Sequence, residues 1–312
     1  MARHFLTLLD YGAEEIVRLV ELGAEFKERR RRGERECDIL RGRSAVLIFE
    51  KPSTRTKASL MVAMEELGGR AYSFSREELQ LARGEPLSDT ARVLSRYFDC
   101  IIARVYKHED LVALAEYSSV PVLNALSDKF HPMQAIADLQ TIREKKGRLG
   151  GLKIAFVGDG RDNVLNSLMV ASAKLGIDLS VACPPKYRPE SELLEKVLEI
   201  AGESGSSIEV LEDPREAVAG ADVVYTDVFV SMGQEAEREE RLRAFLPTYR
   251  VTRELLELAK KDYIFMHCLP ARRGEEVEEG VLEDREHSVV FDQAENRLHS
   301  AKAILAYVVA GV

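Results

Sequence analysis

The sequence predicts an α/β protein of two doubly wound domains with parallel sheets, joined by interdomain helices. Short β-branched apolar runs alternate with helical patterns along the whole chain, and this alternation is typical of parallel α/β sheets. The length of 312 residues suits two domains, each long enough to bury a core. A long helical stretch at residues 131–146, followed by a glycine-bearing turn, separates a first series of elements from a second.

The first series, residues 1–137, is expected to form one domain. It begins with a helix over about residues 13–31 and a buried strand over residues 44–49. The next helix ends at Gly68-Gly69, because glycine stops helices. The remaining expected elements are strands at 70–74, 100–105 and 120–124 and helices around 88–97 and 109–117.

The second series, residues 138–293, is expected to form the other domain, again doubly wound. The last helix begins at residue 294, and residues 294–312 either complete the second domain or return to the first; the pattern leaves both open. The expected strands lie near residues 153–157, 178–182, 207–211, 223–226, 263–266 and 289–291.

Composition and charge argue against several classes of protein. The net charge is −9, from 44 basic and 53 acidic residues, which disfavours a nucleic-acid partner. No apolar run reaches the roughly 18 residues that would suggest a membrane span, and the first residues carry no recognisable export signal. We therefore expect a cytoplasmic protein with neither a membrane nor a nucleic acid as partner.

The four cysteines predict neither disulfides nor a metal site. Cys37, Cys100, Cys183 and Cys268 lie far apart, form no C-x-x-C pair and have no histidines at metal-ligand spacing. One basic cluster, residues 27–35, is interrupted by two glutamates and contains a glycine. We interpret it as the solvated last turn of a helix, which the helix dipole favours, rather than as a polyanion site.

Hydroxyl and cationic side chains gather between the first strand and its helix, in the segment 49–57, Phe-Glu-Lys-Pro-Ser-Thr-Arg-Thr-Lys. Backbone N–H groups at a helix start, with hydroxyls and one or two cations, are what a phosphate needs. An ordinary helix cap with exposed bases is the alternative, and for Ser53-Thr54 alone it is the better explanation. The full run S-T-R-T is much more specific for phosphate.

This segment resembles the carbamoyl-phosphate loop, S-T-R-T-R, of the aspartate and ornithine carbamoyltransferase family, and the likeness continues to the end of the chain. Arg104 ends a first-domain strand and His131-Pro132-Met133-Gln134 opens the junction helix; both match family positions that hold the carbamoyl group. Alone, Arg104 would more often be a surface salt-bridge residue and His131 a helix cap. Together with the loop, the functional interpretation is preferred.

The resemblance implies how carbamoyl phosphate is bound. Attack by an amine builds negative charge on the carbonyl oxygen while phosphate leaves, and both need fixed donors. Arg104, His131 and Thr56 are expected to polarise the carbonyl. A side chain of a neighbouring subunit completes the phosphate site in the family, which implies a homotrimer or multiple of trimers with shared active sites. The implied ligands are Ser53, Thr54, Arg55, Thr56, Gln80 (the position shared between subunits), Arg104, His131, Gln134 (to the carbamoyl nitrogen) and Arg297.

A second segment indicates the acceptor. Residues 227–235, Asp-Val-Phe-Val-Ser-Met-Gly-Gln-Glu, follow a strand and match the family's ornithine motif D-x-x-x-S-M-G, which the aspartate enzymes lack. A plain loop before an exposed helix is the alternative. By resemblance, Asp227 receives the α-ammonium of ornithine. The implied ornithine ligands are Asn163, Asp227, Ser231, Met232, Cys268 and Leu269.

A third match is Met266-His267-Cys268-Leu269-Pro270-Ala271, just after a strand. Cys268 could be a thiol nucleophile or, more often, a buried small hydrophobe. The resemblance gives a third role, in which Cys268, supported by Asp227, helps the δ-amine of ornithine lose its proton before direct attack. The implied catalytic residues are Arg104, His131, Asp227 and Cys268.

The implied activity is transfer of the carbamoyl group of carbamoyl phosphate to L-ornithine, giving L-citrulline and phosphate, with no covalent enzyme intermediate, metal or cofactor. Another amine such as putrescine or N-acetylornithine stays open as the acceptor. The family usually has Arg at Lys57 and Glu at Met61, a pair on one helix face, and these changes leave a non-catalytic member open. Lys keeps the charge but lacks the planar fork.

A nicotinamide dehydrogenase is a rival from another class of enzyme. It is suggested by Val157-Gly158-Asp159-Gly160 after a strand, but it fits poorly. Asn163 stands where the third glycine of the G-x-G-x-x-G pattern belongs. The next strand ends in Ala182-Cys183-Pro184 rather than in an acidic residue that could bind a ribose.

Overall fold

The structure is a computed structural model that describes residues 2–231 and 233–312, and it divides into two compact units. The first unit contains the chain up to Gln140 together with Glu295–Val312, and the second contains Thr141–Ala294. The unit boundaries fall inside two helices, α5 (Pro132–Lys146) and α12 (Val290–Leu305). Within the described residues, none of the helices is long and apolar enough to cross a membrane.

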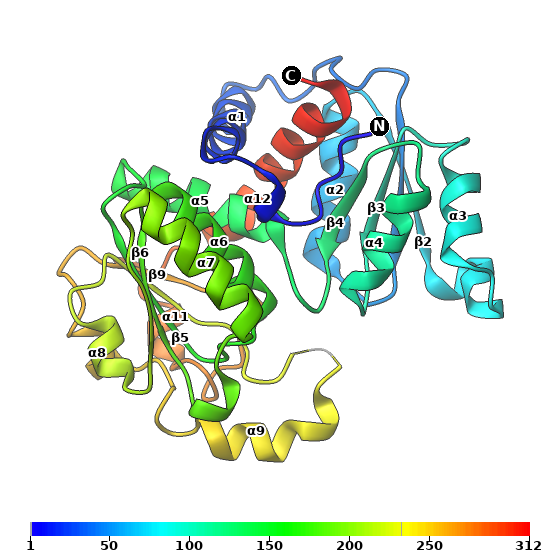
Figure 1. Ribbon diagram of the computed structural model, residues 1–312. Helices are drawn as coiled ribbons and strands as arrows, with labels where there is room; N and C mark the ends of the chain where they lie inside the picture. The colour runs from blue at the N-terminus through cyan, green and yellow to red at the C-terminus, as the bar shows by residue number, and fades with distance from the viewer. Residues whose placement is uncertain (1, 232) are drawn as a thin grey trace. The chain divides into compact units, whose positions relative to one another are not determined.

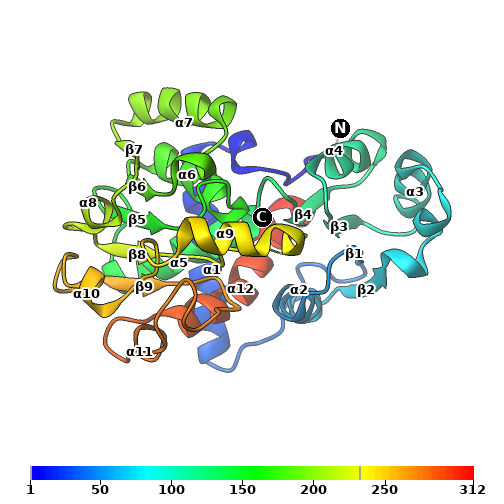
Figure 2. The ribbon, with the colours of Figure 1, turned by 90° about the horizontal axis from the view of Figure 1, so that it is seen from below.

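The first unit is built on a parallel sheet in the order β2-β1-β3-β4. Phe49 pairs with Arg104, so the carboxyl ends of β1 and β3 lie level. β1, β3 and β4 are buried on both faces, as expected of a parallel sheet covered by helices, whereas the edge strand β2 is partly exposed. Figure 2 shows α2 and α4 on opposite sides of this sheet. The strands are β1 (Ser44–Phe49), β2 (Arg70–Ser75), β3 (Cys100–Arg104) and β4 (Val122–Leu126).

Some helices of the first unit connect its strands, and others lie near the two ends of the chain. α12 lies between α1 and α2 (Figure 1) and is joined to both by side-chain hydrogen bonds. The helical elements are η1 (Leu8–Asp10), α1 (Ala13–Arg31), α2 (Thr54–Glu66), η2 (Arg76–Glu78), η3 (Gln80–Arg83), α3 (Leu87–Leu94), α4 (His108–Tyr117) and η6 (Ala306–Ala310), the last a π-helical end of α12.

The second unit is built on a parallel sheet in the order β7-β6-β5-β8-β9, with β5 between β6 and β8 (Figure 2). The strands are β5 (Lys153–Val157), β6 (Asp178–Ala182), β7 (Ile208–Leu211), β8 (Val223–Tyr225) and β9 (Ile264–Met266). The helices are α6 (Asn163–Leu175), η4 (Pro185–Tyr187), α7 (Ser191–Ser204), α8 (Pro214–Val218), η5 (Glu235–Glu237), α9 (Arg238–Phe245), α10 (Arg253–Leu256) and α11 (Glu279–Leu282).

The predicted α/β class with two parallel sheets is confirmed, whereas one expected strand is wrong. Residues 289–291 do not form a strand: α12 begins at Val290, and only Ser288 makes an isolated bridge, to Phe265. The run Val-Val-Phe is too short for its apolar character to distinguish a strand from a buried helix start. The carbonyl of Val289 accepts from Gln293 instead, which begins the helical ladder.

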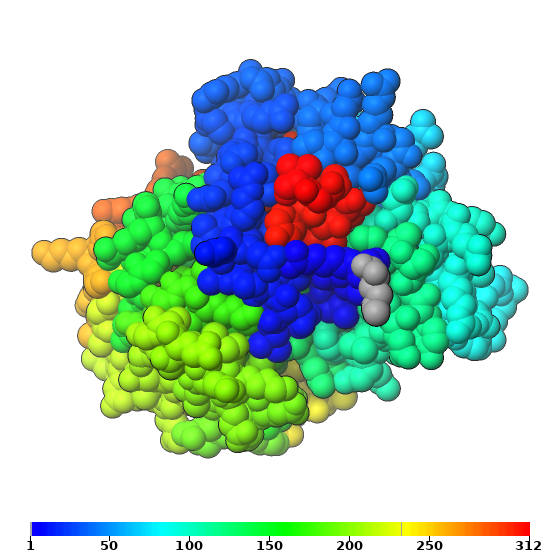
Figure 3. Space-filling view, turned by 45° about the horizontal axis from the view of Figure 1, so that its top comes forward, coloured from blue at the N-terminus to red at the C-terminus, as the bar shows by residue number. Residues whose placement is uncertain are grey.

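The C-terminal segment, left open by the sequence, belongs to the first unit from Glu295 onward. In the space-filling view its red atoms are bordered by the blue atoms of the N-terminal segments (Figure 3). The basic cluster at residues 27–35 needs a correction here. Lys27 is buried and donates to Asn296 of α12 at 2.8 Å, and Arg30 pairs with buried Glu66. The cluster is thus partly a packing surface for α12 and not only a solvated helix end.

Candidate active site

In each sheet the order of strands reverses direction at one point, and ligands of open α/β sheets bind beyond the carboxyl ends of the strands at that point. In the first unit the chain passes from β1 outward to β2 and later from β3 outward to β4, so the reversal lies between β1 and β3. The segment after β1 leads into α2, and Arg104 is the last residue of β3. Both predicted phosphate elements therefore lie at this reversal.

The start of α2 carries the predicted phosphate loop. Ser53 is the N-cap residue of α2 in extended conformation, and within the described chain its side chain makes no capping hydrogen bond. Ser53 thus occupies the N-cap position without the side-chain hydrogen bond that an ordinary helix cap would make. Thr54 is exposed and Arg55 half-buried, whereas Thr56 is buried in the first turn. Amides in the first turn of a helix can bind an anion, so the predicted phosphate loop lies where such a site is favoured.

Arg297 brings two other predicted residues together. Its Nη2 donates to Thr56 Oγ1 at 3.2 Å and its Nη1 donates to Gln134 Oε1 at 2.6 Å. The Gln134 amide nitrogen in turn donates to Asp138 Oδ1 at 2.8 Å, which fixes the orientation of the amide. All four side chains are buried, so the network is stiff. Residues from α2, α5 and α12 thus converge on one place in the first unit.

His131 and Arg104 are buried beside this network, at 4% and 6% exposure. Burial, reinforced by the charges of Arg297 and Arg104, holds the pKa of His131 well below its usual range. The imidazole is therefore neutral at neutral pH and can donate one hydrogen bond without adding positive charge. The backbone carbonyl of His131 accepts from the amides of Gln134 and Ala135 at the start of α5. Gln80 lies apart from these residues in chain position, exposed in η3.

In the second unit the reversal lies between β5 and β8. Asp227 follows β8, and His267 and Cys268 follow β9. One ligand-type atom from each of the three side chains lies within 4.8 Å of the others, and His267 Nδ1 lies 4.0 Å from Asp227 Oδ1. Burial raises the pKa of Asp227, while His267 and a hydrogen bond with Cys268 oppose that shift. These atoms form a compact polar cluster.

His267, which the sequence interpretation did not use, fixes the segment after β9. It is fully buried, its Nε2 lies 3.1 Å from Glu276 Oε1, and its Nδ1 accepts from the backbone N–H of Leu269 at 2.9 Å. This acceptor role places the ring proton on Nε2, toward Glu276. Leu269 has φ +60, a left-handed conformation that is rare for leucine and that this hydrogen bond helps to hold. The signal in the sequence that could have revealed this role of His267 was the segment His267-Cys268-Leu269 itself, which directly follows a strand.

Asp162, also missed, lies beside the predicted Asn163. Its side chain caps α6 by accepting from the amides of Val164 and Leu165 at 2.8 and 2.9 Å. Burial, together with the charge of Asp227, raises the pKa of Asp162 well above its usual range. Asn163 is the first residue of α6 and half-buried. Acidic groups after β5 and β8 therefore face one another in the second unit.

Arg241 of α9 ties these loops together. Its guanidinium forms a buried ion pair with Asp159, which follows β5, and its Nε donates to the carbonyl of Phe229 at 2.6 Å. The Phe229 ring stacks on Phe245 at 4.7 Å between centroids. Ser231, two residues further, is half-buried and its N–H donates to Gln234 Oε1 at 3.0 Å. The predicted Met232 lies outside the described residues.

Two other features could suggest a binding site. Asp227, His267 and Cys268 have the side chains of a metal site, but both ring nitrogens of His267 already form hydrogen bonds, to Leu269 and Glu276.

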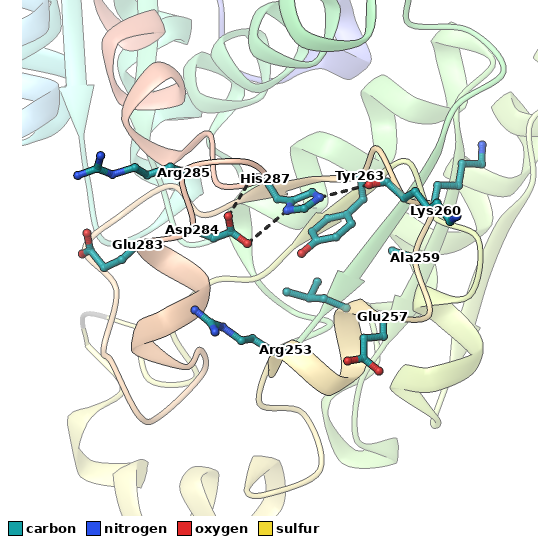
Figure 4. A pocket seen from close by; sticks show the side chains of 11 residues that line it. Arg253, Glu257, Ala259, Lys260, Tyr263, Glu283, Asp284, Arg285 and His287 are labelled. Atoms are coloured by element: carbon teal, nitrogen blue, oxygen red, sulfur yellow. Dashed lines mark hydrogen bonds and ion pairs between the residues drawn. The ribbon is translucent and has the colours of Figure 1, made fainter.

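A pocket of about 650 Å³ lies in the second unit between α10 and residues 283–287 (Figure 4). Tyr263, which lines it, precedes β9, so the pocket lies at the amino end of this strand, opposite to Cys268. None of the predicted site residues lines it.

Comparisons with known proteins cover the whole chain. The family model described as aspartate/ornithine carbamoyltransferase, carbamoyl-P binding domain, matches residues 3–144, and the corresponding Asp/Orn binding domain model matches residues 150–308. The ornithine carbamoyltransferase of Hyperthermus butylicus is 54% identical over 308 residues, covering 99% of this chain and 98% of the relative. The relative from Ignicoccus hospitalis, of the same name, is 55% identical over 307 residues, covering 98% of each.

A solved structure is equally similar. The ornithine carbamoyltransferase from Pyrococcus furiosus superimposes with a TM-score of 0.95 at 52% identity and covers 100% of this chain and 98% of that one. The likeness therefore extends to fold and sequence alike, across both units.

Proposed function

The chain belongs to the aspartate/ornithine carbamoyltransferase family, and we propose that it transfers the carbamoyl group of carbamoyl phosphate to the δ-amine of L-ornithine, releasing L-citrulline and phosphate. The observation that carries the proposal is full-length identity above 50% with proteins named ornithine carbamoyltransferase. The carboxyl group of Asp227, in the polar cluster after β8 and β9, supports an acceptor with an ammonium group.

In the proposed mechanism the first unit binds carbamoyl phosphate. Ser53, Thr54 and the first-turn amides of α2 hold the phosphate, with Arg55 beside them. Arg104 and neutral His131 donate to the carbonyl oxygen, whose negative charge grows as the amine attacks. A neutral His131 can stabilise this oxygen by donating a hydrogen bond. Arg297 holds Thr56 and Gln134 in place for the carbamoyl group.

The second unit binds ornithine in this proposal. Asp227 receives an ammonium group, with Asn163 and Ser231 near the α-carboxylate and Leu269 beside Cys268. The δ-ammonium first loses a proton, helped by Cys268 and Asp227, and the free amine then attacks the carbonyl carbon. The new N–C bond forms while the bond from carbon to the phosphate oxygen breaks. Phosphate leaves with that electron pair, and the proton lost by the attacking nitrogen passes to the departing phosphate. One acyl bond replaces another, so we expect no cofactor and no covalent enzyme intermediate.

We further infer a homotrimer, or a multiple of trimers, in which subunits share active sites. Large apolar side chains are exposed on several elements of the described first unit: Met61, Tyr72, Val93, Tyr97, Tyr106, Val112 and Tyr117. Gln80 is exposed, as a side chain that completes a neighbouring subunit's phosphate site must be. Mixing two inactive variants, Gln80→Ala and Arg104→Ala, tests this: shared sites restore part of the activity, and separate sites restore none.

The assignment of roles follows the division expected from the sequence, with residues 1–137 and the returning C-terminal helix for carbamoyl phosphate and residues 138–293 for ornithine. The family models for carbamoyl-P and Asp/Orn binding support this order along the chain.

The four cysteines are free thiols. Reduced thiols are usual in a reducing compartment and support our expectation of a cytoplasmic enzyme.

The direct test is a stoichiometry measurement with purified protein, carbamoyl phosphate and ornithine. The proposal predicts citrulline and phosphate in equal amounts, with a rate that follows protein concentration. Release of phosphate without citrulline would mean that water and not ornithine is the acceptor. Absence of both products, from protein shown to be folded, would favour a non-catalytic family member.

A further inference from the structure

Lys302 and Glu66 form a buried ion pair that no step above uses. Lys302 lies on α12, five residues after Arg297, and is 1% exposed. Its ammonium donates to Glu66 Oε2 at 2.9 Å and lies 4.8 Å from the centre of the Phe26 ring. Arg30 of α1 pairs with the other carboxylate oxygen of Glu66. A buried carboxylate is thus held by two cations from two different helices.

The helix itself does not favour a negative charge at Glu66, because Glu66 is the last residue of α2. The helix dipole disfavours a negative charge at a helix C-terminus, and burial adds a desolvation cost. The charge is favourable only with Lys302 and Arg30 in place. The pair therefore serves to fix the C-terminal end of α2 against α12 and α1, rather than to stabilise α2 as an isolated helix.

The other end of α2 is held by the same helix. Arg297 donates to Thr56, ten residues before Glu66, in the turn that carries the proposed phosphate loop. α12 is thus bonded to α2 at both ends, through Arg297 at the first turn and Lys302 at the last residue. Because a hydrogen-bonded helix of 13 residues moves nearly as a rigid rod, a shift at Glu66 is carried to the first turn.

α12 is itself anchored on the side of Arg297. Asn296 Oδ1 accepts from Lys27 Nζ at 2.8 Å and from Gln140 Nε2 at 3.2 Å. Gln140 packs closely on α1, because a Cβ added to Gly23 would clash with its Oε1. With α12 fixed to α1 and α5, the pair of Lys302 and Glu66 transmits that fixed position to α2.

We propose that Lys302 and Glu66 are positioning residues of the phosphate loop, whose ion pair sets where the first turn of α2 meets the phosphate of carbamoyl phosphate. This inference rests on the proposed function. Neither residue touches the substrate. Catalytic geometry tolerates little displacement, and shifts of about 1 Å far from the chemistry can cost roughly 100-fold in rate.

The test compares wild type with Lys302→Met and Glu66→Gln. Glu66→Gln keeps the shape and one of the two acceptor oxygens, so it removes the charge and one of the two hydrogen bonds without leaving a cavity. It is therefore the milder change and remains informative where Lys302→Met fails to fold. We expect the KM for carbamoyl phosphate to rise about tenfold in Lys302→Met and by a smaller factor in Glu66→Gln, since each 1.4 kcal/mol is a factor of ten. The KM for ornithine should stay within about twofold of wild type.

The matched control is Asp222→Asn in the second unit. Asp222 is buried, accepts from the amide of Lys153 at 2.9 Å and pairs with Lys260 at 2.8 Å. This variant should lower stability while leaving the KM for carbamoyl phosphate unchanged. A merely structural role for Lys302 predicts the same behaviour for Lys302→Met, so an unchanged KM for carbamoyl phosphate in a less stable Lys302→Met protein overturns the proposal.

Calorimetric titration with inorganic phosphate separates this inference from the proposed function. If wild type makes no citrulline, the function proposal fails. Weaker phosphate binding by Glu66→Gln and Lys302→Met than by Asp222→Asn still supports the positioning role. Equal phosphate affinity in all three variants and wild type contradicts it, whatever the activity.

Discussion

Near the carboxyl ends of β1 and β3 the buried charged side chains are mainly cationic, although Asp138 is buried there as well, whereas those beyond β5 and β8 are mainly acidic. The first group is Arg104 and Arg297, with His131 kept neutral by burial and by their charges. The second is Asp162 and Asp227, with Asp159 already paired to Arg241. Two sheets of the same design thus present basic side chains in one unit and carboxyl side chains in the other where their ligands are proposed to bind.

This difference teaches how one architecture serves two substrates. A dianionic phosphate ester needs donors and cations, and the first unit collects them from segments far apart in sequence, including the C-terminal helix. A cationic amine needs carboxylates, and the second unit supplies them from the loops after its strands. The reversal point of the sheet sets the place, and the residues after the strands set the charge.

The largest expected effect is on the second unit. Arg241→Met leaves Asp159 buried without its partner, and removing one member of a buried pair typically costs about 3–5 kcal/mol. Denaturant unfolding should show this loss, and the KM for ornithine should rise because the carbonyl of Phe229 loses its donor. Arg243→Met, an exposed arginine on the same helix, is the control and should change neither quantity.

Next in size is the effect of Arg104→Ala on turnover. The charge that Arg104 meets grows in the transition state, so kcat should fall about 100- to 1000-fold, as when one oxyanion donor is removed. Steady-state kinetics with both substrates varied measures this. Arg92→Ala, which removes an exposed arginine of α3, serves as control. An Arg104→Ala enzyme with normal kcat and only a raised KM would show that Arg104 binds phosphate and does not stabilise the reacting carbonyl.

A smaller effect is expected from Asp227→Asn, which removes the negative charge and keeps the shape. Losing a hydrogen bond to a charged group costs about 1.5–3 kcal/mol, so the KM for ornithine should rise roughly 10- to 150-fold. The KM for carbamoyl phosphate should stay nearly constant. Equal increases in both KM values would show that Asp227 acts on both substrates. The contrast in charge between the two units would then not explain which unit binds ornithine.

The smallest effect concerns Asp162 and its pH dependence. Its pKa is raised in the folded state, so the folded protein holds a proton that the unfolded chain releases above about pH 3.8. Its contribution to stability is therefore full below that pH and is lost as the pH rises toward the folded pKa. Asp162→Asn mimics the protonated form and still caps α6. We expect it to be more stable than wild type at pH 7, with the gain shrinking toward pH 4 in unfolding experiments; a gain that grows on acidification would contradict the sign.

The sequence reached the fold class and the local motifs, because both depend on short-range patterns. Alternating strands and helices predicted two parallel sheets, and S-T-R-T predicted an anion site at the start of α2. The error at residues 289–291 came from a three-residue apolar run with no periodicity to read. That Arg297 lies in the first unit followed only from the path of α12, which the pattern left open.

Residues that act through distant partners stayed invisible to the sequence. Arg241 meets Asp159 across 82 positions of the chain, and Lys302 meets Glu66 across 236. Lys27 belonged to an exposed-looking basic run, yet it is buried on α12. Burial and pairing of charges depend on how helices pack, and a single sequence does not encode that in any local spacing.

The most direct test of the account is the choice of acceptor. Wild-type protein and carbamoyl phosphate are incubated with ornithine, putrescine, N-acetylornithine or aspartate, and kcat/KM for carbamoylated product is compared. The acidic second unit and the segment 227–235 predict a strong preference for ornithine and no reaction with aspartate. Preference for putrescine or N-acetylornithine would contradict the roles given to Asp227 and Ser231 while leaving the phosphate site intact, and preference for aspartate would contradict the proposed charge contrast itself.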